Sequence, residues 1–390
     1  MKKLQKQRLI NSIAKKIYWL PIIMMISIAS CKKEEEPTSP ADDTEKTDEV
    51  YASRNSIPHV TVHPGSSIQA AVNAANAGTI IFIEPGIYKE AVVVNKPRIQ
   101  LVGTKGSCKD IIIENPGDEE NGITVSDEGD GFFLKNVTVR NFEENGVLLT
   151  RVDNFVLDHV ASVNNSEYGL FPVLCNHGVI KFCSATGSSD TGIYVGQSEN
   201  IIIQFNVAFA NVSGFEIENC TNVNASWNEA YDNTAGLSVF LLPGLTVKTS
   251  SNILVAHNKI HDNNLANFAP PGGGLEVNIP QGAGILLVGA DNTTIEHNLI
   301  SRNNFVGVAT VSTLVLGALA GIPPEAFADI EPNPDGAMIT HNILKNNGTA
   351  APPGLPLPAA ELLWDGSGSN NCWSNNIYSF SFPASLPVCN

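Results

Sequence analysis

The sequence predicts an all-β fold, a right-handed parallel β-helix with coils of about 22–24 residues, and two repeats carry that prediction. In the first, a Gly followed by a short apolar–x–apolar strand recurs at steps of 24, 23, 23, 22, 22, 48 and 23 residues, the step of 48 being one coil with an insertion. Runs this short cannot build helices or long hairpins, but stacked coils can pair them with equivalent strands above and below. The apolar residues after the glycines form the predicted interior column: Ile123, Val147, Leu170, Ile193, Phe215, Leu237, Ile285 and Val308.

The second repeat is a small polar residue, usually Asn, at one place in each coil. Equivalent residues of parallel strands lie about 4.8 Å apart, so stacked amides can hydrogen-bond along the solenoid. This assigns the recurring Asn to structure and not to chemistry. The predicted members are Asn136, Asp158, Cys183, Asn206, Asn228, Asn258, Asn298 and Asn342.

The residue before this Asn is His257, His297 and His341 in the later coils. Three stacked imidazoles suggest a metal site. Earlier coils, however, hold Phe182, Phe205 and Trp227 in the same register, which favours a packing position.

The first part of the repeat region predicts a cap. Residues 63–94, "HPGSSIQAAVNAANAGTIIFIEPGIYKEAVVV", indicate a short helix that begins at a Ser and ends at Gly78, then a strand and a Pro-Gly turn. A helix there would cover the open end of the solenoid. The stretch resembles the N-terminal cap of the pectin-lyase-like β-helices, and right-handed crossovers are also the general preference for parallel strands. The predicted β-helix domain is 59–390.

The N-terminal segments predict export. Residues 1–30 combine a basic start with the apolar run "IYWLPIIMMISIAS", as in a signal peptide, with an uncleaved anchor helix as the alternative. The end of this run before Cys31 resembles a bacterial lipobox, which implies lipidation of Cys31, a membrane anchor and an outer-membrane location facing the cell surface or the periplasm. Residues 31–58 are rich in acid, Pro and Ser and predict a disordered tether.

The net charge of the chain narrows the classes of partner that can be expected. The first thirty residues hold six of the 23 basic residues and none of the 39 acidic ones, so the rest of the chain has a net charge of −22. This excludes nucleic acid as an expected partner, because its binding requires neutralised phosphates. Cations and basic or neutral glycans fit the charge better.

The register of the repeat also indicates which cysteines can form a disulfide. Cys372 and Cys389 lie near the C-terminus and are the candidate disulfide. Cys175 and Cys220 hold one register two coils apart, about 9.6 Å on the stacking distance, which is too far for a disulfide. With Cys183 in the polar column, all three are expected to be partly buried thiols.

A column of acids precedes the repeat Gly in four consecutive coils. "EENG" occurs at 119–122 and 143–146, followed by "SEYG" and "SDTG" in the next two coils. Two interpretations stay open: a solvated acidic edge at a turn, or a Ca²⁺ site, because Ca²⁺ prefers clustered oxygen ligands. The candidate ligands are Glu144, Glu167 and Asp190.

The outward positions of the strand after the Gly give the candidate site. Tyr194, Glu216 and Glu218 face the same way on neighbouring coils, and insertions at 241–250, 265–282 and 313–336 border the same strand. Long loops in a solenoid usually build one functional face. A uronate lyase or epimerase could use Tyr194 as base, with Ca²⁺ neutralising the substrate, whereas a hydrolase would need a carboxyl pair. The face has no Arg or Lys of its own, which weakens the lyase alternative.

Residues 167–282 resemble a family of exported parallel β-helix repeat proteins, often lipoproteins. The phrases that carry the resemblance are "EYGLFPVLC", "SSDTGIYVGQSENIII", "NVSGFEIENC", "NTAGLSVFLLPGL" and "NFAPPG". The resemblance implies the fold and the exported location, and a second exported protein similar to a c-type cytochrome as partner, but no activity. The sequence therefore favours a protein that binds polysaccharide or a partner on this face. The alternative is a uronate polysaccharide lyase or epimerase, and whether the protein is an enzyme stays open.

Overall fold

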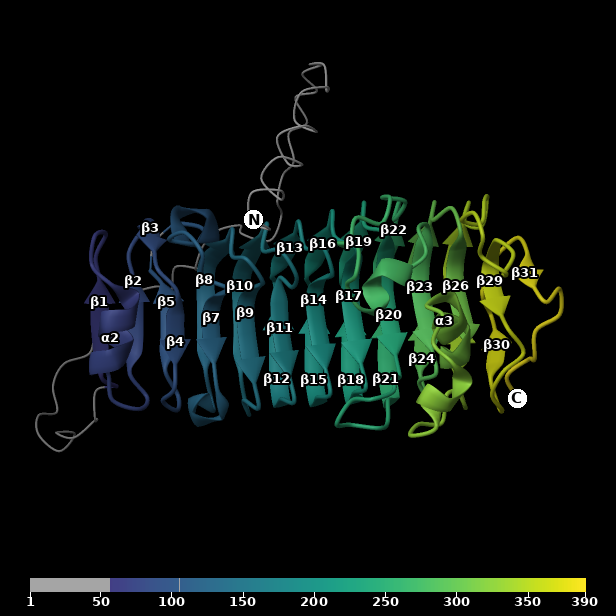
Figure 1. Ribbon diagram of the computed structural model, residues 1–390, viewed down its shortest axis with the longest axis horizontal. Coiled ribbons are helices and arrows are strands. Elements are labelled where there is room, and N and C mark those ends of the chain that lie inside the picture. Colours follow the sequence, from purple (N-terminus) through teal and green to yellow (C-terminus); the bar gives the residue numbers. More distant parts are fainter. Residues whose placement is uncertain (1–56, 105) are drawn as a thin grey trace, which may run out of the picture.

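The computed structural model describes residues 57–104 and 106–390. The signal peptide and Cys31 lie outside the described residues, and so does the tether up to residue 56. The described chain is a parallel β-helix whose coils follow one another along a single axis, with the cap at one end (Figure 1). No helix among the described residues is long and apolar enough to cross a membrane.

The face that carries the predicted site residues is an 11-stranded parallel sheet. Each coil contributes one strand, and the insertions lie in front of this sheet in Figure 1. In spatial order its strands are β4 (Val92–Val94), β7 (Asn121–Val125), β9 (Asn145–Thr150), β11 (Leu170–Val173), β14 (Thr191–Gly196), β17 (Ser213–Glu218), β20 (Ala235–Phe240), β23 (Ala283–Val288), β26 (Val306–Val311), β29 (Ala360–Trp364) and β31 (Ser381–Phe382).

The other strands form two further parallel ladders that share β8 and β10. One ladder runs through β1 (His59–Val62), β2 (Ile80–Ile83), β5 (Gln100–Gly103), β8 (Phe133–Arg140), β10 (Val156–Val163), β12 (Asn176–Lys181), β15 (Glu199–Gln204), β18 (Thr221–Ser226), β21 (Ser251–Ala256), β24 (Thr294–Glu296), β27 (Met338–Thr340) and β30 (Cys372–Ser374). The other runs through β3 (Gly86–Lys89), β6 (Ile111–Glu114), β8, β10, β13 (Ser184–Thr186), β16 (Val207–Phe209), β19 (Glu229–Tyr231), β22 (Lys259–His261), β25 (Leu299–Ser301) and β28 (Ile343–Lys345).

The helical elements are few and short. They are α2 (Ile68–Ala74), α3 (Thr313–Leu319) and the single 3₁₀ turns η2 (Cys108–Asp110), η3 (Asp127–Gly129), η4 (Leu275–Asn278) and η5 (Pro324–Phe327).

The predicted interior column is confirmed. Its residues pair in register from coil to coil, for example Ile193 with Phe215 and Phe215 with Leu237. All eight of its side chains are buried in one continuous core. A column of this kind fixes the register, because a slip of one residue would turn every apolar side chain of the strand outward.

Helix α2 caps the N-terminal end, as expected. Ser67 is the N-cap and accepts a hydrogen bond from the Ala70 backbone N–H at 3.0 Å, while the Glu90 carboxylate accepts two more N–H groups of the first turn. Ile68 and Val72 point into the core. The helix ends at Ala74, four residues before the expected stop at Gly78, whose positive φ of 80° belongs to the following turn.

The asparagine ladder exists but begins later than predicted. Asn206, Asn228, Asn258, Asn298, Asn342 and Asn376 each accept hydrogen bonds from the preceding Asn or Cys and donate to backbone carbonyls. Asn136 and Asp158 are not in it: Val137 and Val160 occupy that register, and Asp158 pairs with Lys135 and Lys181. Strands β8 and β10 continue through this corner, where Asn136 and His159 have the positive φ of the later ring column, so Asn136 lies one residue and Asp158 two residues before the ladder position.

A second ladder, not anticipated from the sequence, explains the repeat glycines. Its buried members each lie against a repeat Gly of the preceding coil: Asn165, Asn211, Asn233, Asn263, Asn303 and Asn347. At Gly214, an added Cβ would lie 2.6 Å from the Gly236 carbonyl oxygen and 2.9 Å from the Asn233 amide. The Gly recurs because the backbone of the next coil and the ladder amide leave no room for a side chain.

The ring column is a packing feature. His257, His297 and His341 stack face to face at centroid distances of 5.1 and 5.0 Å, continuing a stack that includes Phe205 and Trp227. All five residues have positive φ at a turn between two ladders.

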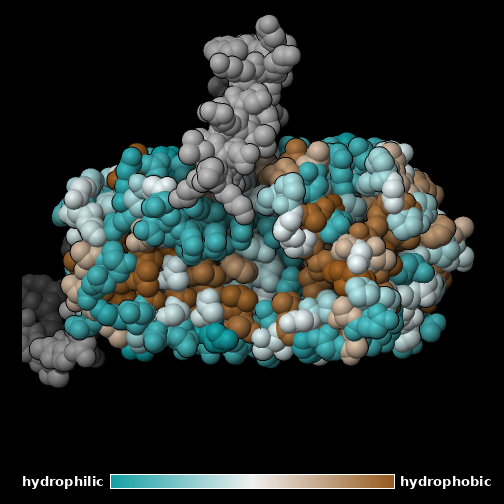
Figure 2. All heavy atoms as spheres, viewed as in Figure 1, coloured by the Kyte–Doolittle hydropathy of each residue, from teal (hydrophilic) through white to brown (hydrophobic). Residues whose placement is uncertain are grey.

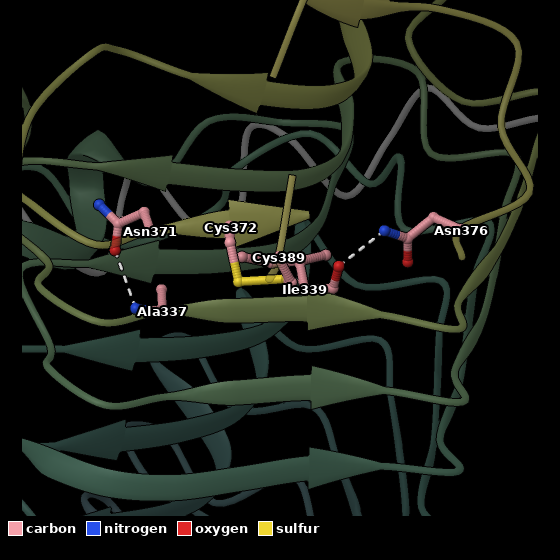
Figure 3. The surroundings of a disulfide bond; sticks show 6 residues. All are labelled: Ala337, Ile339, Asn371, Cys372, Asn376 and Cys389. Carbon is pink, nitrogen blue, oxygen red and sulfur yellow. Dashed lines mark hydrogen bonds between the residues drawn. A yellow bond between two sulfur atoms is a disulfide. The ribbon is translucent and has the colours of Figure 1, made fainter. Parts of the chain in front are cut away.

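A disulfide closes the C-terminal end. Cys372 and Cys389 are bonded, and Asn371 and Asn376 hold the neighbouring strand through Ala337 and Ile339 (Figure 3). Cys175, Cys183 and Cys220 are free and buried, and burial raises the pKa of each thiol to about 12, so none is a reactive thiolate.

Candidate functional site

The predicted residues Tyr194, Glu216 and Glu218 come together on the 11-stranded sheet. Tyr194 of β14 pairs in register with Glu216 of β17, and Glu218 pairs with Gly196. Because Gly196 has no side chain, the Tyr194 ring leans across it, and an added Cβ at Gly196 would overlap the phenol oxygen. The Tyr194 hydroxyl therefore reaches the next coil and donates to Glu218 Oε1 at 3.0 Å.

Glu216 and Glu218 form a hydrogen-bonded carboxyl dyad. Their exposed fractions are 7 % and 9 %, and the two side chains hydrogen-bond each other. Burial raises the pKa of both groups, most strongly that of Glu216, to which the nearby Asp190 and Glu218 charges add. Thr191 also donates its hydroxyl to Glu216 Oε2 at 2.9 Å. Two buried carboxyls in contact cannot both ionise readily, so the dyad holds a shared proton.

Asp190, one of the predicted calcium ligands, lies at the edge of the dyad. Its carboxylate accepts a hydrogen bond from the Tyr168 hydroxyl, and its Oδ1 lies 3.0 Å from the Thr191 hydroxyl, whose single proton is shared between Asp190 and Glu216. Burial raises the pKa of Asp190 to about 7, and the Glu276 and Glu218 charges act in the same direction. Asp190 is thus a carboxyl that changes its charge near neutral pH.

These groups face a cavity of about 330 Å³. The insertions supply its outer wall: Leu242 and Leu245 from one, Glu276 and Ile279 from the next, and Ile322 from the third. The three insertions are the ones expected to border the site. In Figure 2 the same side of the molecule shows apolar surface over the early strands of the sheet and around the α3 insertion.

Aromatic rings close one side of the cavity. Tyr168 stacks on Phe171 with a centroid distance of 4.2 Å, and both rings meet the edge or face of Tyr194, at 5.1 and 4.7 Å. Tyr168 lines the cavity itself, and burial raises the pKa of its phenol far above the ordinary value. The rings of Tyr168, Phe171 and Tyr194 therefore form a packed wall.

The cavity has no cationic side chain. Among the described residues that line it, none is Lys, Arg or His. Elsewhere in the described chain, half-buried acids have such partners: Asp158 lies 3.3 Å from Lys135, Glu114 lies 2.6 Å from Arg140, and Asp262 binds Arg302. The cavity is thus acidic, and no described residue that lines it supplies a positive charge.

The three predicted calcium ligands do stack. The Glu167 N–H donates to the Glu144 carbonyl and the Asp190 N–H to the Glu167 carbonyl, at 2.8 and 3.2 Å, so the column follows the coils. Burial and the neighbouring Glu144 and Glu276 raise the pKa of Glu167. Within the described residues, the group of three acids whose ligand atoms approach within 4.8 Å is a different one, Asp291, Glu331 and Asp335. The calcium assignment of the column stays a prediction.

Sequence reasoning missed three members of the site. Tyr168 and Thr191 directly precede repeat Gly positions, whereas the sequence prediction of the site rested on the strand residues after each Gly. Glu276 comes from the insertion at 265–282, and no periodicity in the sequence places that loop over the sheet.

Comparison with known proteins settles the family. The family model of the right-handed β-helix region matches residues 121–248 and 241–378, which together make up more than half of the chain. The chain belongs to the right-handed β-helix family. A comparison of this β-helix protein with curated sequences finds no match.

Solved structures share the architecture. The A-modules of the Azotobacter vinelandii mannuronan C-5 epimerases AlgE4 and AlgE6 superpose with TM-scores of 0.53 and 0.52 at 16% identity, over 80% of this chain and 90% and 91% of theirs. The GH136 lacto-N-biosidase from Eubacterium ramulus gives a TM-score of 0.56 at 12% identity, over 82% of this chain and 68% of that one. At these identities the likeness establishes the fold alone.

Proposed function

We propose that this β-helix protein binds a glycan in the cavity over β14, β17 and β20. The observation that carries the proposal is the cavity of about 330 Å³, which is lined by Tyr168, by apolar side chains and by the carboxyls of Asp190, Glu216, Glu218 and Glu276. Saccharide rings offer hydroxyls to carboxyl oxygens and C–H faces to aromatic and aliphatic walls, and a concave site with a few convergent polar groups is the usual ligand site of a protein. The similar folds named above include proteins whose names place them on mannuronan and on lacto-N-biose glycans.

The geometry supports binding over the predicted lyase or epimerase. Tyr194 donates its proton to Glu218, and burial with the Glu218 charge raises the pKa of its phenol well above 10, so it is a poor base for abstracting a sugar proton. No described cation lines the cavity to neutralise a uronate carboxylate. The Glu216–Glu218 dyad does not suit hydrolysis either, because retaining and inverting glycosidases hold their carboxyls about 5–9.5 Å apart.

Asp190 favours a second candidate, acid–base chemistry on the bound sugar. A carboxyl whose pKa is raised to about 7 can donate or accept a proton at neutral pH, which is the condition for an efficient general acid or base. In that case Asp190, and not the dyad, is the catalytic residue. Ultraviolet absorbance during incubation with uronate polysaccharides, with and without Ca²⁺, checks the lyase form of this candidate through the unsaturated sugar that β-elimination leaves.

The context of the site is also proposed. Lipidation at Cys31 would anchor the domain at the outer membrane through the tether of 31–58 and hold the cavity near extracellular or periplasmic glycans. An exported c-type-cytochrome-like partner stays a prediction from the family resemblance.

The test is calorimetric titration of neutral, basic and acidic oligosaccharides into the full chain with Cys31→Ser. We expect micromolar to millimolar binding of at least one class, abolished by Tyr168→Ala and by Glu216→Gln with Glu218→Gln. Glu120→Gln is the matched control, because Glu120 belongs to the same acidic column but lies outside the cavity, exposed to solvent. Binding that none of the cavity variants weakens would place the glycan site elsewhere and refute the proposal.

A further inference from the structure

We infer that the glycan this cavity takes carries a free amino group, as a glucosamine-type sugar does. The inference rests on the proposed function and names the class of its ligand. Three observations carry it: the buried acids without a cationic partner on the cavity wall, the shortage of hydrogen-bond donors around them, and a geometry of the acids that does not converge on one metal ion.

The first observation concerns charge. Glu216 and Glu218 are more than nine-tenths buried, Asp190 and Glu276 join them at the cavity wall, and no described cation lines that wall. An unpaired buried carboxylate costs several kcal/mol, so proteins normally pair such groups. Here no described residue that lines the cavity supplies the compensating charge, and a ligand that brings a positive charge would favour the ionised form of these carboxyls.

The second observation concerns donors. The dyad receives hydroxyl hydrogen bonds from Thr191 and Tyr194, at 2.9 and 3.0 Å, which leaves carboxyl oxygens with capacity to accept more. Ser238 lies next to Glu216 in register on β20; it is fully buried, and no described group hydrogen-bonds its hydroxyl. The spare acceptors of the cavity carboxyls suit a ligand with several N–H and O–H donors. An ammonium group supplies three donors on one atom.

The third observation separates an ammonium from a metal ion. Calcium requires several oxygens within about 2.3–2.6 Å of one point, so its protein ligands must converge. Among the described residues, Asp190, Glu216 and Glu218 are not a group whose ligand atoms lie within 4.8 Å of one another. They lie on one side of a cavity of about 330 Å³, whose other lining residues include Tyr168, Leu242 and Leu245. An organic cation fits both the acids and the apolar wall, and aromatic faces add a favourable cation–π term.

The test compares three trisaccharides that differ in charge: triglucosamine, tri-N-acetylglucosamine and trigalacturonate, titrated at pH 7 into the full chain with Cys31→Ser. We expect triglucosamine to bind at least tenfold more tightly than its acetylated form, because acetylation removes the positive charge and leaves the rings unchanged. Trigalacturonate should bind most weakly. Raising the NaCl concentration should weaken the triglucosamine complex selectively.

Variants assign the preference to the cavity. The isosteric pair Glu216→Gln with Glu218→Gln should reduce the preference for triglucosamine to less than threefold, while Glu120→Gln should keep it. Circular dichroism checks that the double variant is folded; if it is not, Ser238→Ala and Asp190→Asn serve in its place, with a smaller loss of preference expected.

Each outcome is decisive. Equal affinity for the two glucosamine forms, or tighter binding of trigalacturonate, overturns the inference and leaves the proposed glycan site standing. Failure of all three sugars and of the neutral oligosaccharides overturns the proposed function itself. Binding of Ca²⁺ alone that is lost in the double variant would assign the acids to a metal and also overturn the inference.

Discussion

Asp190→Asn should stabilise the protein above neutral pH, because burial disfavours the ionised form of the wild-type carboxyl. Burial raises its pKa from 3.8 to about 7. The unfolded chain releases this proton near pH 4 and the folded chain only near pH 7, so the wild-type free energy of unfolding falls as pH rises between these values.

The size of the effect follows from the shift. About three pKa units at 1.36 kcal/mol each give a loss of about 4 kcal/mol between pH 4 and pH 7. An Asn side chain keeps one carbonyl oxygen for the Tyr168 and Thr191 hydroxyls, and a weakened hydrogen bond costs about 1 kcal/mol. The variant should therefore be about 1 kcal/mol less stable than wild type at pH 4 and about 3 kcal/mol more stable at pH 7.5.

The assay is urea unfolding of both proteins at half-unit steps from pH 4 to pH 8, followed by circular dichroism. Because the Asp190 charge also raises the pKa of Glu216, the difference between the two profiles reports the ionisation of Asp190 together with its effect on Glu216. Profiles that run parallel, or a variant that loses stability at pH 7.5, would refute the reasoning that Asp190 is a buried acid with a raised pKa.

Three further changes test other parts of the structure. His261→Gln should remove about 1–2 kcal/mol below pH 6.5 and progressively less as pH rises, because hydrogen bonding to Glu229 raises the pKa of the imidazole; thermal melts against pH would show it, and a pH-independent loss would contradict it. Gly214→Ala should cost more than about 2 kcal/mol because its Cβ meets the next coil at 2.6 Å, whereas Gly117→Ala, with open space around it, should be nearly neutral in denaturant unfolding. Asn258→Ala removes four ladder hydrogen bonds and should lower the free energy of unfolding by about 3 kcal/mol or prevent folding. A loss below about 1 kcal/mol would show that the ladder does not stabilise the fold.

The fold could be predicted because a solenoid repeats its constraints. In every coil the repeat Gly leaves no room for a side chain and the residue after it is buried. Ile193 and Phe215 could therefore be assigned to the interior from spacing alone. The prediction failed in the coils whose ladder position holds Val137 and Val160: Asn136 and Asp158, one and two residues before that position, were counted into a ladder that begins at Cys183.

The site was predictable only in part. Outward alternation placed Tyr194, Glu216 and Glu218 on one face because side chains alternate along a strand. The contact between the two Glu side chains, and the lean of Tyr194 over Gly196, depend on side-chain torsions that spacing does not specify. Glu276 arrives on an insertion whose path is set by tertiary packing against the sheet, so its place at the cavity could not be derived from the repeat.

The most direct test of the central claim is a crystal structure of the protein soaked with triglucosamine. Density for a sugar in the cavity, with its nitrogen within hydrogen-bond distance of Glu216, Glu218 or Asp190, is the predicted result. Density confined to the exposed ring column around Phe205 and Trp227, with the cavity unchanged, would contradict the account.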